Sequence, residues 1–458
     1  MTPASIHEPA QETPIVHECD LCVVGGGCTG VFAAVRAARL GATVALVENN
    51  GFFGGVATAG LVNVWHSIYD TNAERAIIGG LTVELIERLQ QRDAVVLYPS
   101  NESRYAVFNS AELICELDAI ACEQPKVRPF LHARFVSAAQ QDGRMTAAII
   151  EDKSGRRAIR ARYFVDATGD GDVLARLGLP TATLSDLQPP TTCALIYGLD
   201  HVAERDPGFS LGAAVHDPRH PNALRRDQPG FVWHSEAVGL PGTRMVAGTR
   251  VRDADCSDAD QLTRAEIEGR RQARAIRDIV HDGYAGGEAV ALAALPAYIG
   301  IRETRHATCL HRLTEREVLE GVRFKDAIAN GSYRVDVHHS HKAGLTFRYL
   351  DGTEVYIVPG QPRVEGRWRE ERQVNPTFYQ VPYRCLVPQG ARNVLVAGRL
   401  VDADRGAYGA IRVMVNCNQT GEATGVASVL ALAEGLDVGQ VDGEQLRREL
   451  ARGGSQII

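Results

Sequence analysis

Three glycines near the N-terminus have the spacing of a phosphate-binding turn. Gly25, Gly27 and Gly30 stand in VVGGGCTGVFAAVRAA, after an apolar run and before an alanine-rich one. Gly25 would allow a sharp turn, Gly27 a close approach of the backbone to a pyrophosphate, and Gly30 tight packing of a helix on a strand. The first residues of that helix, Cys28 and Thr29, would offer unpaired N–H groups to the phosphates.

An acidic residue stands where the next predicted strand ends. Glu48 follows the apolar run VALV and precedes Asn49. A carboxylate at that place can accept hydrogen bonds from ribose hydroxyls. Strand, glycine turn, helix, strand and acid together predict a dinucleotide site, and the alternative is an ordinary glycine turn of an α/β domain. These residues alone do not separate NAD from FAD.

Two arginines in IRETR are candidates for binding an anionic substrate. Arg302 and Arg305 could each bind a carboxylate through two parallel hydrogen bonds. A strand would place them on opposite faces, whereas a helix or a turn would bring them together. The alternative is a structural role, in ion pairs with Glu303, Glu315 or Glu317.

Three histidines cluster in VDVHHSHK, namely His338, His339 and His341. A metal ion would need further ligands, and only Asp336 is near, so we expect no metal site. Histidine can transfer protons near neutral pH, which the oxidation of an alcohol or an amine requires. The alternative is a surface or packing role for all three.

The elements that must position these residues lie far apart in the sequence. Residues 161–172, ARYFVDATGDGD, read as a buried strand ending in Ala167, Thr168 and Gly169. Residues 392–425 read as another strand, a loop and a helix with two glycines four residues apart. Each of these strands ends in small residues that a cofactor could approach closely.

In this order, the motifs resemble those of the FAD-dependent oxidoreductases in the glutathione-reductase-like superfamily. More narrowly, the chain resembles the group related to fumarate reductase flavoproteins and L-aspartate oxidase. The resemblance covers nearly the whole chain and rests on VVGGGCTG, GGVATAG, DATGDGD, YIGIRETR, FKDAIANGSYRVDVH, VPYRCLVP and the VAGR–RVMVN–TGEATG run. It implies FAD as the cofactor, with Glu48 on the adenosine ribose.

The resemblance also assigns expected roles around the flavin. It places the loop of Gly54, Gly55, Val56 and Thr58, the DATG strand end, and Gly398 with Arg399 against the cofactor, and it points the helix after Asn416 at the pyrimidine edge. No histidine lies between Glu48 and Thr58, so we expect FAD to be bound without a covalent link. A family arginine–arginine–aliphatic run is altered to Arg305-His306-Ala307, so substrate details should not be transferred.

The resemblance suggests roles for four further side chains. His338 matches an Asp-x-His pattern and is our preferred acid or base, and Tyr408 is a further catalytic candidate. His66 follows the GGVATAG loop and could face the flavin, or it could pack between Trp65 and Tyr69. Arg412 could stabilise the reduced flavin.

The alternative for Arg412 is a salt bridge to Asp402 or Asp404. Asn416 lies near the predicted start of the last long helix, where it could cap the helix or bind the flavin.

The predicted fold class is α/β, with a discontinuous Rossmann-type FAD-binding domain and an inserted α+β substrate domain. The expected divisions are a loose arm at 1–14, an FAD-binding domain at 15–60, 126–176 and 385–458, a helical insertion at 61–125 and a substrate domain at 177–384. A β-meander is expected within 126–176, and a helix at about 264–282 with a Thr263–Glu266 capping box. A second capping box is expected at Thr314 and Glu317.

Composition limits the partners. The 458 residues carry a net charge of −7, which argues against nucleic acid and anionic membranes. We see neither a spanning apolar run nor a secretory signal, and the ten cysteines lack ligand spacing, so we expect a cytoplasmic protein with reduced thiols. Cys19 and Cys22 are not expected to form a metal or dithiol site.

The expected reaction is hydride transfer between a small polar organic substrate and flavin N5. Dehydrogenation at a C–O or C–N bond is our first choice, and the alternatives are C=C reduction or desaturation, flavin monooxygenation, or a nucleotide-binding protein without redox turnover. A second G-x-G-x-x-G turn is missing, so we expect an external electron acceptor, such as oxygen or a quinone. The sequence allows a homo-oligomer without indicating one.

Overall fold

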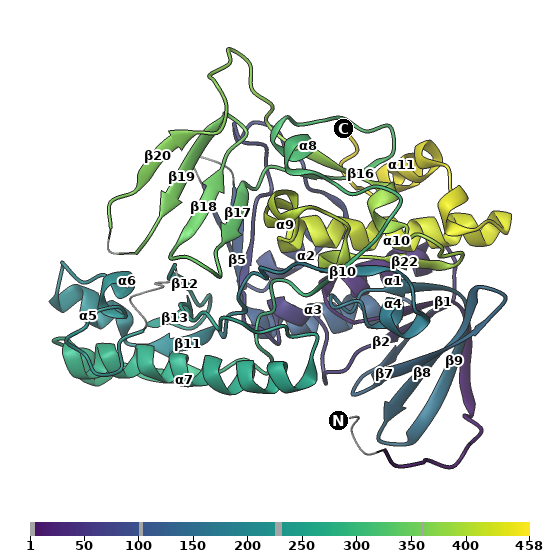
Figure 1. Cartoon of the computed structure of the whole chain (residues 1–458), viewed down its shortest axis with the longest axis horizontal. Helices are drawn as coiled ribbons and strands as arrows, with labels where there is room; N and C mark the ends of the chain where they lie inside the picture. The colour runs from purple at the N-terminus through teal and green to yellow at the C-terminus, as the bar shows by residue number, and fades with distance from the viewer. Residues whose placement is uncertain (1–4, 100–103, 225–230, 360) are drawn as a thin grey trace.

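A largely parallel β-sheet forms the centre of the chain, which the computed structural model describes over residues 5–99, 104–224, 231–359 and 361–458. The parallel strands run in the order β6-β2-β1-β9-β22, as Figure 1 shows in part. The strands of the whole sheet are β1 (Ile15–Val24), β2 (Val44–Val47), β6 (Val127–Phe130), β7 (Arg134–Gln141), β8 (Arg144–Asp152), β9 (Gly155–Asp166) and β22 (Val394–Val396).

The predicted β-meander is confirmed in β7, β8 and β9. These strands are antiparallel, and they turn at Asp142-Gly143 and at Lys153-Ser154. β9 is long enough to pair with β8 through its first half and with β22 through its last residues. One strand therefore joins the meander to the parallel part of the sheet.

Two helices cover one face of the parallel strands in close mutual contact. They are α1 (Cys28–Arg39) and α10 (Met414–Glu434). A Cβ atom on Gly421 would lie 2.1 Å from the carbonyl oxygen of Thr29, and one on Gly425 would lie 2.3 Å from that of Ala33. The two glycines that are four residues apart thus serve helix packing rather than contact with a cofactor.

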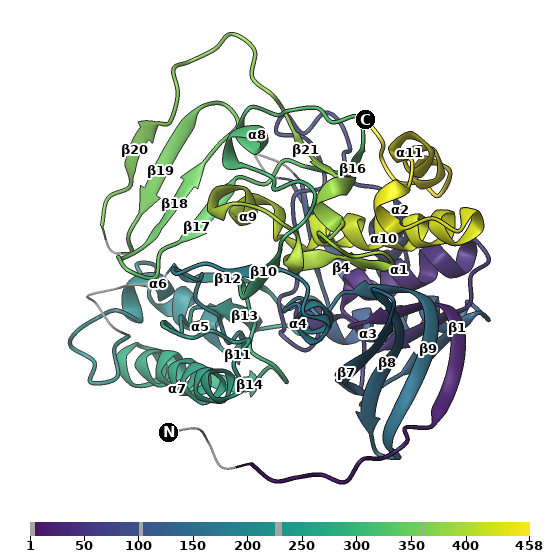
Figure 2. The same cartoon turned by 45° about the vertical axis from the view of Figure 1, so that its right-hand side comes forward.

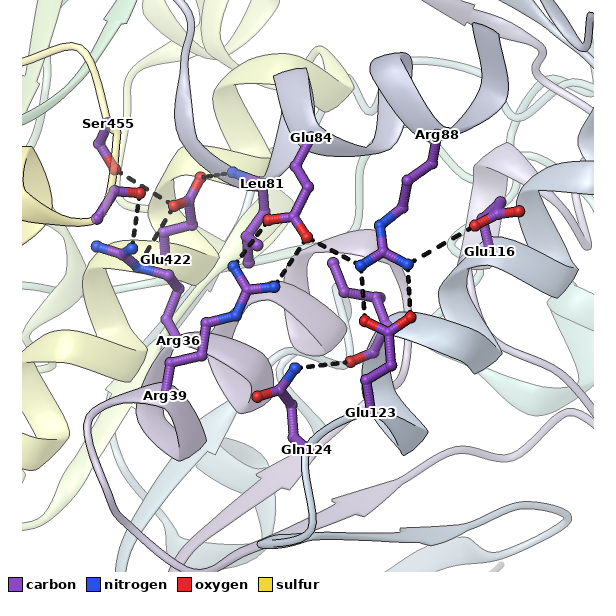
Figure 3. Close-up of polar contacts among 12 residues, drawn as sticks. Arg36, Arg39, Leu81, Glu84, Arg88, Glu116, Glu123, Gln124, Glu422 and Ser455 are labelled. Carbon is purple, nitrogen blue, oxygen red and sulfur yellow. Dashed lines mark hydrogen bonds and ion pairs between the residues drawn. The ribbon is translucent and has the colours of Figure 1, made fainter. Parts of the chain in front are cut away.

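A buried ion pair joins these helices to the next layer (Figure 3). Glu422 of α10 is 1% exposed, and its carboxylate lies 3.5 Å from Nε of Arg36 on α1. The same carboxylate accepts hydrogen bonds from the backbone N–H of Leu81 and from the hydroxyl of Ser455. One side chain therefore ties α10 to α1, to α2 (Gly80–Gln90) and to the C-terminal segment.

Five smaller sheets account for the other described strands, in the orders β3-β5-β4, β10-β15, β12-β13-β11-β14, β16-β21 and β17-β18-β19-β20. Their bounds are β3 (Val64–Trp65), β4 (Val95–Tyr98), β5 (Tyr105–Phe108), β10 (Thr181–Thr183), β11 (Ala194–Tyr197), β12 (Trp233–Glu236), β13 (Thr243–Ala247), β14 (Ala291–Ala294), β15 (Arg305–Ala307), β16 (Ala327–Gly331), β17 (Val335–His338), β18 (Leu345–Arg348), β19 (Thr353–Ile357), β20 (Val364–Arg367) and β21 (Tyr379–Pro382).

The remaining α-helices surround these sheets. They are α3 (Ser110–Cys122), α4 (Asp172–Leu177), α5 (Leu199–Arg205), α6 (Leu211–Ala214), α7 (Ala259–Gly283), α8 (Glu315–Leu319), α9 (Arg405–Ile411) and α11 (Gly443–Arg452). Short 3-10 turns include η1 (Gly55–Ala57), η2 (Gly287–Ala289), η3 (Tyr383–Leu386), η4 (Gly398–Leu400) and η5 (Val438–Gln440). Among the described helices, none combines the length and apolar character that crossing a bilayer requires.

Two helix predictions differ from the structure. The loop expected between the strand and the helix of residues 392–425 contains the short helix α9, and the helix expected at about 264–282 begins earlier. α7 begins five residues before the expected 264, because Asp258 caps it by accepting from the N–H of Gln261. Thr263 bonds back to the carbonyl of Ala259 and caps nothing, so the first predicted capping box is wrong. The second, at Thr314 and Glu317, is present in α8.

The division into domains stays a prediction. Residues 5–14 of the expected N-terminal arm form no helix or strand and are almost all exposed. Figure 2 shows this segment along the outside of the molecule. Residues 1–4 of the same arm lie outside the described part of the chain.

Candidate functional site

The three glycines of the N-terminal turn have distinct environments. Gly25 has φ +105°, and its Cβ would lie 2.3 Å from the carbonyl oxygen of Ala167 at the end of β9. A Cβ on Gly30 would lie 1.8 Å from the carbonyl oxygen of Gly25. Gly27 differs, since a Cβ there would meet only the Cα of Gly55, at 3.9 Å. The protein therefore fills the space beside Gly25 and Gly30 and leaves space in front of Gly27 for a ligand.

Glu48 contacts this turn through the backbone N–H of Gly26. Its carboxylate is 6% exposed and accepts hydrogen bonds of 2.7 Å from the N–H of Gly26 and from the N–H and side-chain amide of Asn50. Burial raises the pKa of Glu48. Asn49 beside it is exposed. Glu48 thus supports the glycine turn, and Oε2, which accepts only the bond from Gly26, keeps lone-pair capacity for a ribose hydroxyl as well.

The loop expected to run toward the flavin packs against the glycine turn. Gly54 pairs with Gly27 as a parallel bridge, and its N–H donates to the carbonyl of Gly26. Cys28 directs its thiol toward the carbonyl of Gly54, at 3.5 Å. Gly55 and Val56 continue into η1, and Thr58 closes the loop by donating to the carbonyl of Phe53.

The end of β9 is organised by a buried carboxylate. Asp166 accepts from the N–H and hydroxyl of Thr168 and from two N–H groups at the start of α4. Burial raises the pKa of Asp166 to about 6. Gly169 has φ +78°, and a Cβ there would lie 2.6 Å from a nitrogen of Arg399. Asp166 therefore shapes the DATG turn so that Arg399 lies across Gly169.

Arg399 and Asn416 retain polar atoms without partners in the described protein. Arg399 pairs with Asp170 through Nη2 at 3.2 Å, whereas its buried Nη1 has no hydrogen bond. Asn416 donates to the hydroxyl of Tyr379, and its buried Oδ1 has no donor. Buried polar atoms normally have partners, so orphaned atoms in one region point to a ligand or water there.

Two helices begin at this region without a side-chain cap. α1 starts after Gly27 and α10 after Val413, and neither has an acidic residue in its first turn. Asn416, which could have capped α10, lies inside its first turn and bonds elsewhere. Uncapped N–H groups and the positive helix end favour phosphates at α1 and negative charge on a ring at α10. The glycine cradle, the two helix starts and the orphaned atoms fit FAD.

A pair of interior arginines lies beyond the cofactor residues. Nη1 of Arg302 donates to the carbonyl of Pro189 and to the hydroxyl of Thr191, both at 2.5 Å. Arg250, 9% exposed, donates to the same hydroxyl at 2.9 Å. Neither has a carboxylate partner in the described protein. Burial, and then the charges of Arg250 and Arg412, hold the pKa of Arg302 well below its usual range.

A carboxylate and a histidine lie next to this pair. Asp336 is 5% exposed, and its Oδ2 accepts from Arg412 at 3.0 Å and from Tyr333 at 3.1 Å. Nε2 of His338 lies 3.3 Å from Oδ1 of Asp336. Burial alone would raise the pKa of Asp336, but His338 and Arg412 hold it well below its usual range.

Burial favours the neutral form of His338. Burial, together with the charges of Arg302 and Arg250, lowers its pKa to about 3 despite the opposing effect of Asp336. If Nε2 carries the proton toward Asp336, Nδ1 keeps a free lone pair. The pair of side chains can therefore act as an oriented base.

His66 lies near this group rather than in the packing expected for it. Its ring contacts Tyr333, with centroids 4.6 Å apart, and Tyr105, at 6.5 Å. Burial, and then the charge of Arg334, lowers its pKa to about 3. The alternative that placed His66 between Trp65 and Tyr69 is not what the ring contacts show.

Tyr408 and Arg305 are placed differently from Arg302. The hydroxyl of Tyr408 donates to the backbone carbonyl of Arg302 at 2.7 Å, so it positions that residue. Arg305 donates to the carbonyl of Asp170, to Asp172 and to the carbonyl of Ser257. The two arginines of IRETR therefore point to different surroundings, and neither makes the expected alternative ion pair with a glutamate.

Three further residues that the sequence singled out have the following partners. Arg412 pairs with Asp336 instead of Asp402 or Asp404. His339 bonds to Thr346, and His341 is largely exposed beside Asp186. The described residues contain no group of three or more potential metal ligands.

Sequence reasoning missed two residues of the interior group. Arg250 comes from the segment after β13, and Gln188 from an irregular stretch before Pro189. Gln188 is fully buried and accepts from the N–H of His338 at 3.5 Å. Neither residue belongs to a spaced motif, and both come to the site through tertiary contacts. An arginine within the apolar stretch MVAGTRV is the single signal that could have identified Arg250.

Comparison with known protein families gives a match over nearly the whole chain. A family model for FAD dependent oxidoreductases matches residues 20–450. Two curated relatives match over short stretches. Mitochondrial dihydrolipoyl dehydrogenase of Schizosaccharomyces pombe is 31% identical over 109 residues, 19% of this chain and 21% of that protein. Dihydrolipoyl dehydrogenase of Trypanosoma brucei brucei is 33% identical over 95 residues, 18% and 20% of the two chains. The matches span about a fifth of these relatives' length.

Solved structures that match over most of the chain do so at low identity, and two of them serve as examples. p-Nitrophenol 4-monooxygenase from Pseudomonas putida DLL-E4 is 12% identical, covers 95% of this chain and 85% of its own, and has a TM-score of 0.47. A geranylgeranyl bacteriochlorophyll reductase-like protein from Thermoplasma acidophilum is 11% identical, covers 96% and 84%, and has the same score. The family model and the geometry agree, so the chain is an enzyme with a Rossmann-type fold and FAD as its cofactor, and it belongs to the FAD-dependent oxidoreductase family.

Proposed function

We propose that the enzyme removes hydrogen from a small polar organic anion at a C–O or C–N bond. The observation that carries this proposal is the pair of interior guanidinium groups, Arg250 and Arg302, which have no carboxylate partner among the described residues and lie beside the neutral base His338. Anion binding, orientation and proton acceptance are the tasks that these residues can perform.

Charge supports an anionic substrate. Three guanidinium groups, those of Arg250, Arg302 and Arg412, lie close enough to affect ionisation around Asp336. Asp336 neutralises part of this charge, and its direct partner is Arg412. A carboxylate on the substrate would compensate the rest, and two parallel hydrogen bonds from one guanidinium would fix its orientation.

The proton has a defined acceptor in this proposal. His338 is neutral and therefore ready to take a proton from a substrate hydroxyl or amine. Asp336 orients the ring and would stabilise the imidazolium once it forms, because the carboxylate stays ionised beside Arg412. The interior position of both groups excludes bulk water from the transfer.

The cofactor residues supply orientation and charge. Bound FAD would provide the two-electron acceptor for the substrate hydrogen. The start of α1 and Gly27 would hold the phosphates, Glu48 the ribose, and Arg399 with the start of α10 the ring end. These groups leave the interior arginines and His338 to the substrate.

A second candidate function runs in the opposite direction. Reduction of a C=C bond next to a carbonyl needs a proton donor in the interior, and the pKa of Arg302 is held well below its usual range. This would agree with a relation to fumarate reductase flavoproteins and L-aspartate oxidase, which we propose from the order of the sequence motifs.

The cellular setting is part of the same proposal. An external acceptor such as oxygen or a quinone would reoxidise the cofactor, since a second G-x-G-x-x-G turn is missing. We infer a cytoplasmic location from the ten cysteines, none of which forms a disulfide in the structure. The oligomeric state is open, and a homo-oligomer would be compatible with this setting.

An anaerobic reduction screen tests the proposed function. The purified protein should be yellow, and a panel of small organic acids should include one that bleaches its flavin absorbance under nitrogen. His338→Gln should keep the colour and lower the bleaching rate by roughly 100-fold, because a general base contributes that much. The control is His234→Gln, at an exposed histidine of β12. Flavin that no organic compound can reduce, or equal rates in both variants, would refute the proposal.

A further inference from the structure

Gln188 is a fully buried amide between Arg302 and His338. Its Oε1 accepts from the N–H of His338, and its backbone N–H donates to Glu303 at 2.9 Å. The next residue, Pro189, provides the carbonyl that accepts from Arg302. The amide nitrogen Nε2 of Gln188 is buried and has no hydrogen-bond partner in the described protein. A neutral donor is therefore left unpaired at the site.

Donors outnumber acceptors among the orphaned atoms of this interior group. Nε of Arg250, Nε of Arg412 and Nε2 of Gln188 are donors without partners. The acceptors are Oδ1 of Asn416 and Oδ1 of Asp336, and the second of these already faces a histidine ring nitrogen at 3.3 Å. Each orphaned donor loses the free energy of a hydrogen bond unless a ligand or water supplies an oxygen. The group is therefore built for a ligand rich in acceptor oxygens.

We propose that the substrate is a hydroxy acid, whose hydroxyl is held by Gln188 and His338 and whose carboxylate is held by Arg302 and Arg250. This inference rests on the proposed function and selects a C–O bond over a C–N bond. In it, Nε2 of Gln188 donates to the hydroxyl oxygen, and Nδ1 of His338 accepts the hydroxyl proton. Gln188 is thereby a specificity-determining residue.

The charge of the group disfavours an amino acid as substrate. An amino acid carries an ammonium group near neutral pH, and this cation would lie among the guanidinium groups of Arg250, Arg302 and Arg412. Repulsion between like charges is strong in an interior of low dielectric constant. A hydroxyl brings no charge, and its oxygen satisfies an orphaned donor.

The reaction balances with the groups named. The carbon that bears the hydroxyl loses a hydride to the oxidised cofactor, and the oxygen loses its proton to His338. The C–O single bond becomes a C=O bond, so a hydroxy acid yields a keto acid. Negative charge that develops on the oxygen before the carbonyl forms is stabilised by the Gln188 amide and by Arg302.

Pairs of compounds that differ in one group test this inference on the holoenzyme. The probes are glycolate and glycine, lactate and alanine, malate and aspartate, and hydroxyglutarate and glutamate, with succinate and glutarate as acids without the hydroxyl. Anaerobic flavin bleaching should be at least about 100-fold faster for one hydroxy acid than for its amino partner. Faster bleaching by an amino acid would overturn the inference and leave the proposed function intact. Bleaching by succinate or glutarate alone would overturn both, because these acids can lose hydrogen only across a C–C bond.

Binding provides a second readout. The Gln188→Leu variant should bind the acid without the hydroxyl with nearly unchanged affinity, measured from the shift that this acid causes in the flavin spectrum. With a reactive hydroxy acid, the limiting bleaching rate of the variant should fall roughly 10- to 100-fold. Gln389→Leu, at an exposed glutamine, is the control. If the variant fails to fold, the compound pairs on the natural protein decide. A panel in which no hydroxy acid binds or bleaches counts against the inference, and a protein that does not retain FAD refutes the proposed function itself.

Discussion

Arg302 and Arg250 show how burial changes what a guanidinium can do. On the surface, either would pair with a carboxylate or with water at little net gain. Here both share the hydroxyl of Thr191, and burial, with Asp336 opposing it, lowers the pKa of Arg250 to about 10. Two adjacent buried cations are unfavourable in the absence of an anion. An anion that binds between them relieves this unfavourable free energy and therefore binds more tightly.

Replacement of Arg302 by lysine should weaken turnover and preserve colour. Lysine keeps the charge but cannot make two parallel bonds to a carboxylate, so we expect kcat/KM for the substrate found in the screen to fall about tenfold or more, roughly 1.4 kcal/mol. The control is Arg323→Lys, because Arg323 also donates to backbone carbonyls but lies away from the site. Unchanged kinetics in Arg302→Lys would assign Arg302 to structure, and steady-state kinetics with measured FAD content checks the outcome.

Helices α1 and α10 pack closely because two residues of α10 at their contact are glycines, and a buried carboxylate of α10 lies in the same interface. Gly421 and Gly425 allow the two backbones to touch, and this contact fixes the distance between the two helix starts that we propose for the cofactor. Glu422, next to Gly421, lies in the same interface. Burial raises the pKa of Glu422 to about 7, although Arg36 opposes this shift.

Glu422 should make stability depend on pH. Its pKa in the folded protein lies above the usual 4.5, so the folded state binds its proton more tightly than the unfolded state does. The resulting stabilisation is complete below about pH 4.5 and is lost as the pH rises through about 7, on the order of 3 kcal/mol. We expect Glu422→Gln to flatten the fall of the thermal midpoint between pH 5 and pH 8, as the shift implies.

The control for Glu422 lies on the same helix. Glu434 is exposed near the end of α10, and Glu434→Gln should keep the pH dependence of the natural protein. The comparison uses the slope with pH rather than the absolute midpoint, since Arg36 loses a charged partner in Glu422→Gln. An identical slope in all three proteins would show that Glu422 does not titrate in this range.

Elements with local signals were predictable from the sequence, and elements that depend on tertiary contacts were not. Periodicity and turn residues identified the meander and the helices α2 and α3, because these signals lie within the segment itself. The start of α7 was misplaced, since Thr263 satisfies a capping pattern while Asp258 makes the bond. A pattern shows which side chain could cap a helix, but geometry decides which one does.

The whole molecule explains why the candidate site was only half predictable. The cofactor residues recur in spaced glycine motifs, because a pyrophosphate constrains the backbone closely. The residues that we propose for the substrate come from four distant segments, those of Gln188, Arg250, Arg302 and His338, and each is a single polar residue without a spacing rule. Nothing in the sequence states that these segments meet, and the fold supplies that information.

In the whole molecule, bound FAD should stabilise the folded state. It would contact the start of α1, the ends of β9 and β22, and the start of α10, which lie far apart in the sequence. A ligand that binds only the folded state stabilises it by about 4 kcal/mol when its concentration is about 1,000 times Kd. Removal of FAD should therefore lower the thermal midpoint, and added FAD should restore it in a concentration-dependent manner.

Gly27→Ala should weaken FAD binding without changing the stability of the protein that lacks FAD. A Cβ at this position meets only the Cα of Gly55, at 3.9 Å, so the protein without FAD should unfold at the temperature of the natural protein without FAD. The same Cβ enters the space left for the phosphates, so added FAD should give little or no increase in midpoint. Gly25→Ala should instead destabilise both forms, because its Cβ would lie 2.3 Å from the carbonyl oxygen of Ala167. Thermal melts of the three proteins with and without FAD check this, and full stabilisation of Gly27→Ala by FAD would place the phosphates elsewhere.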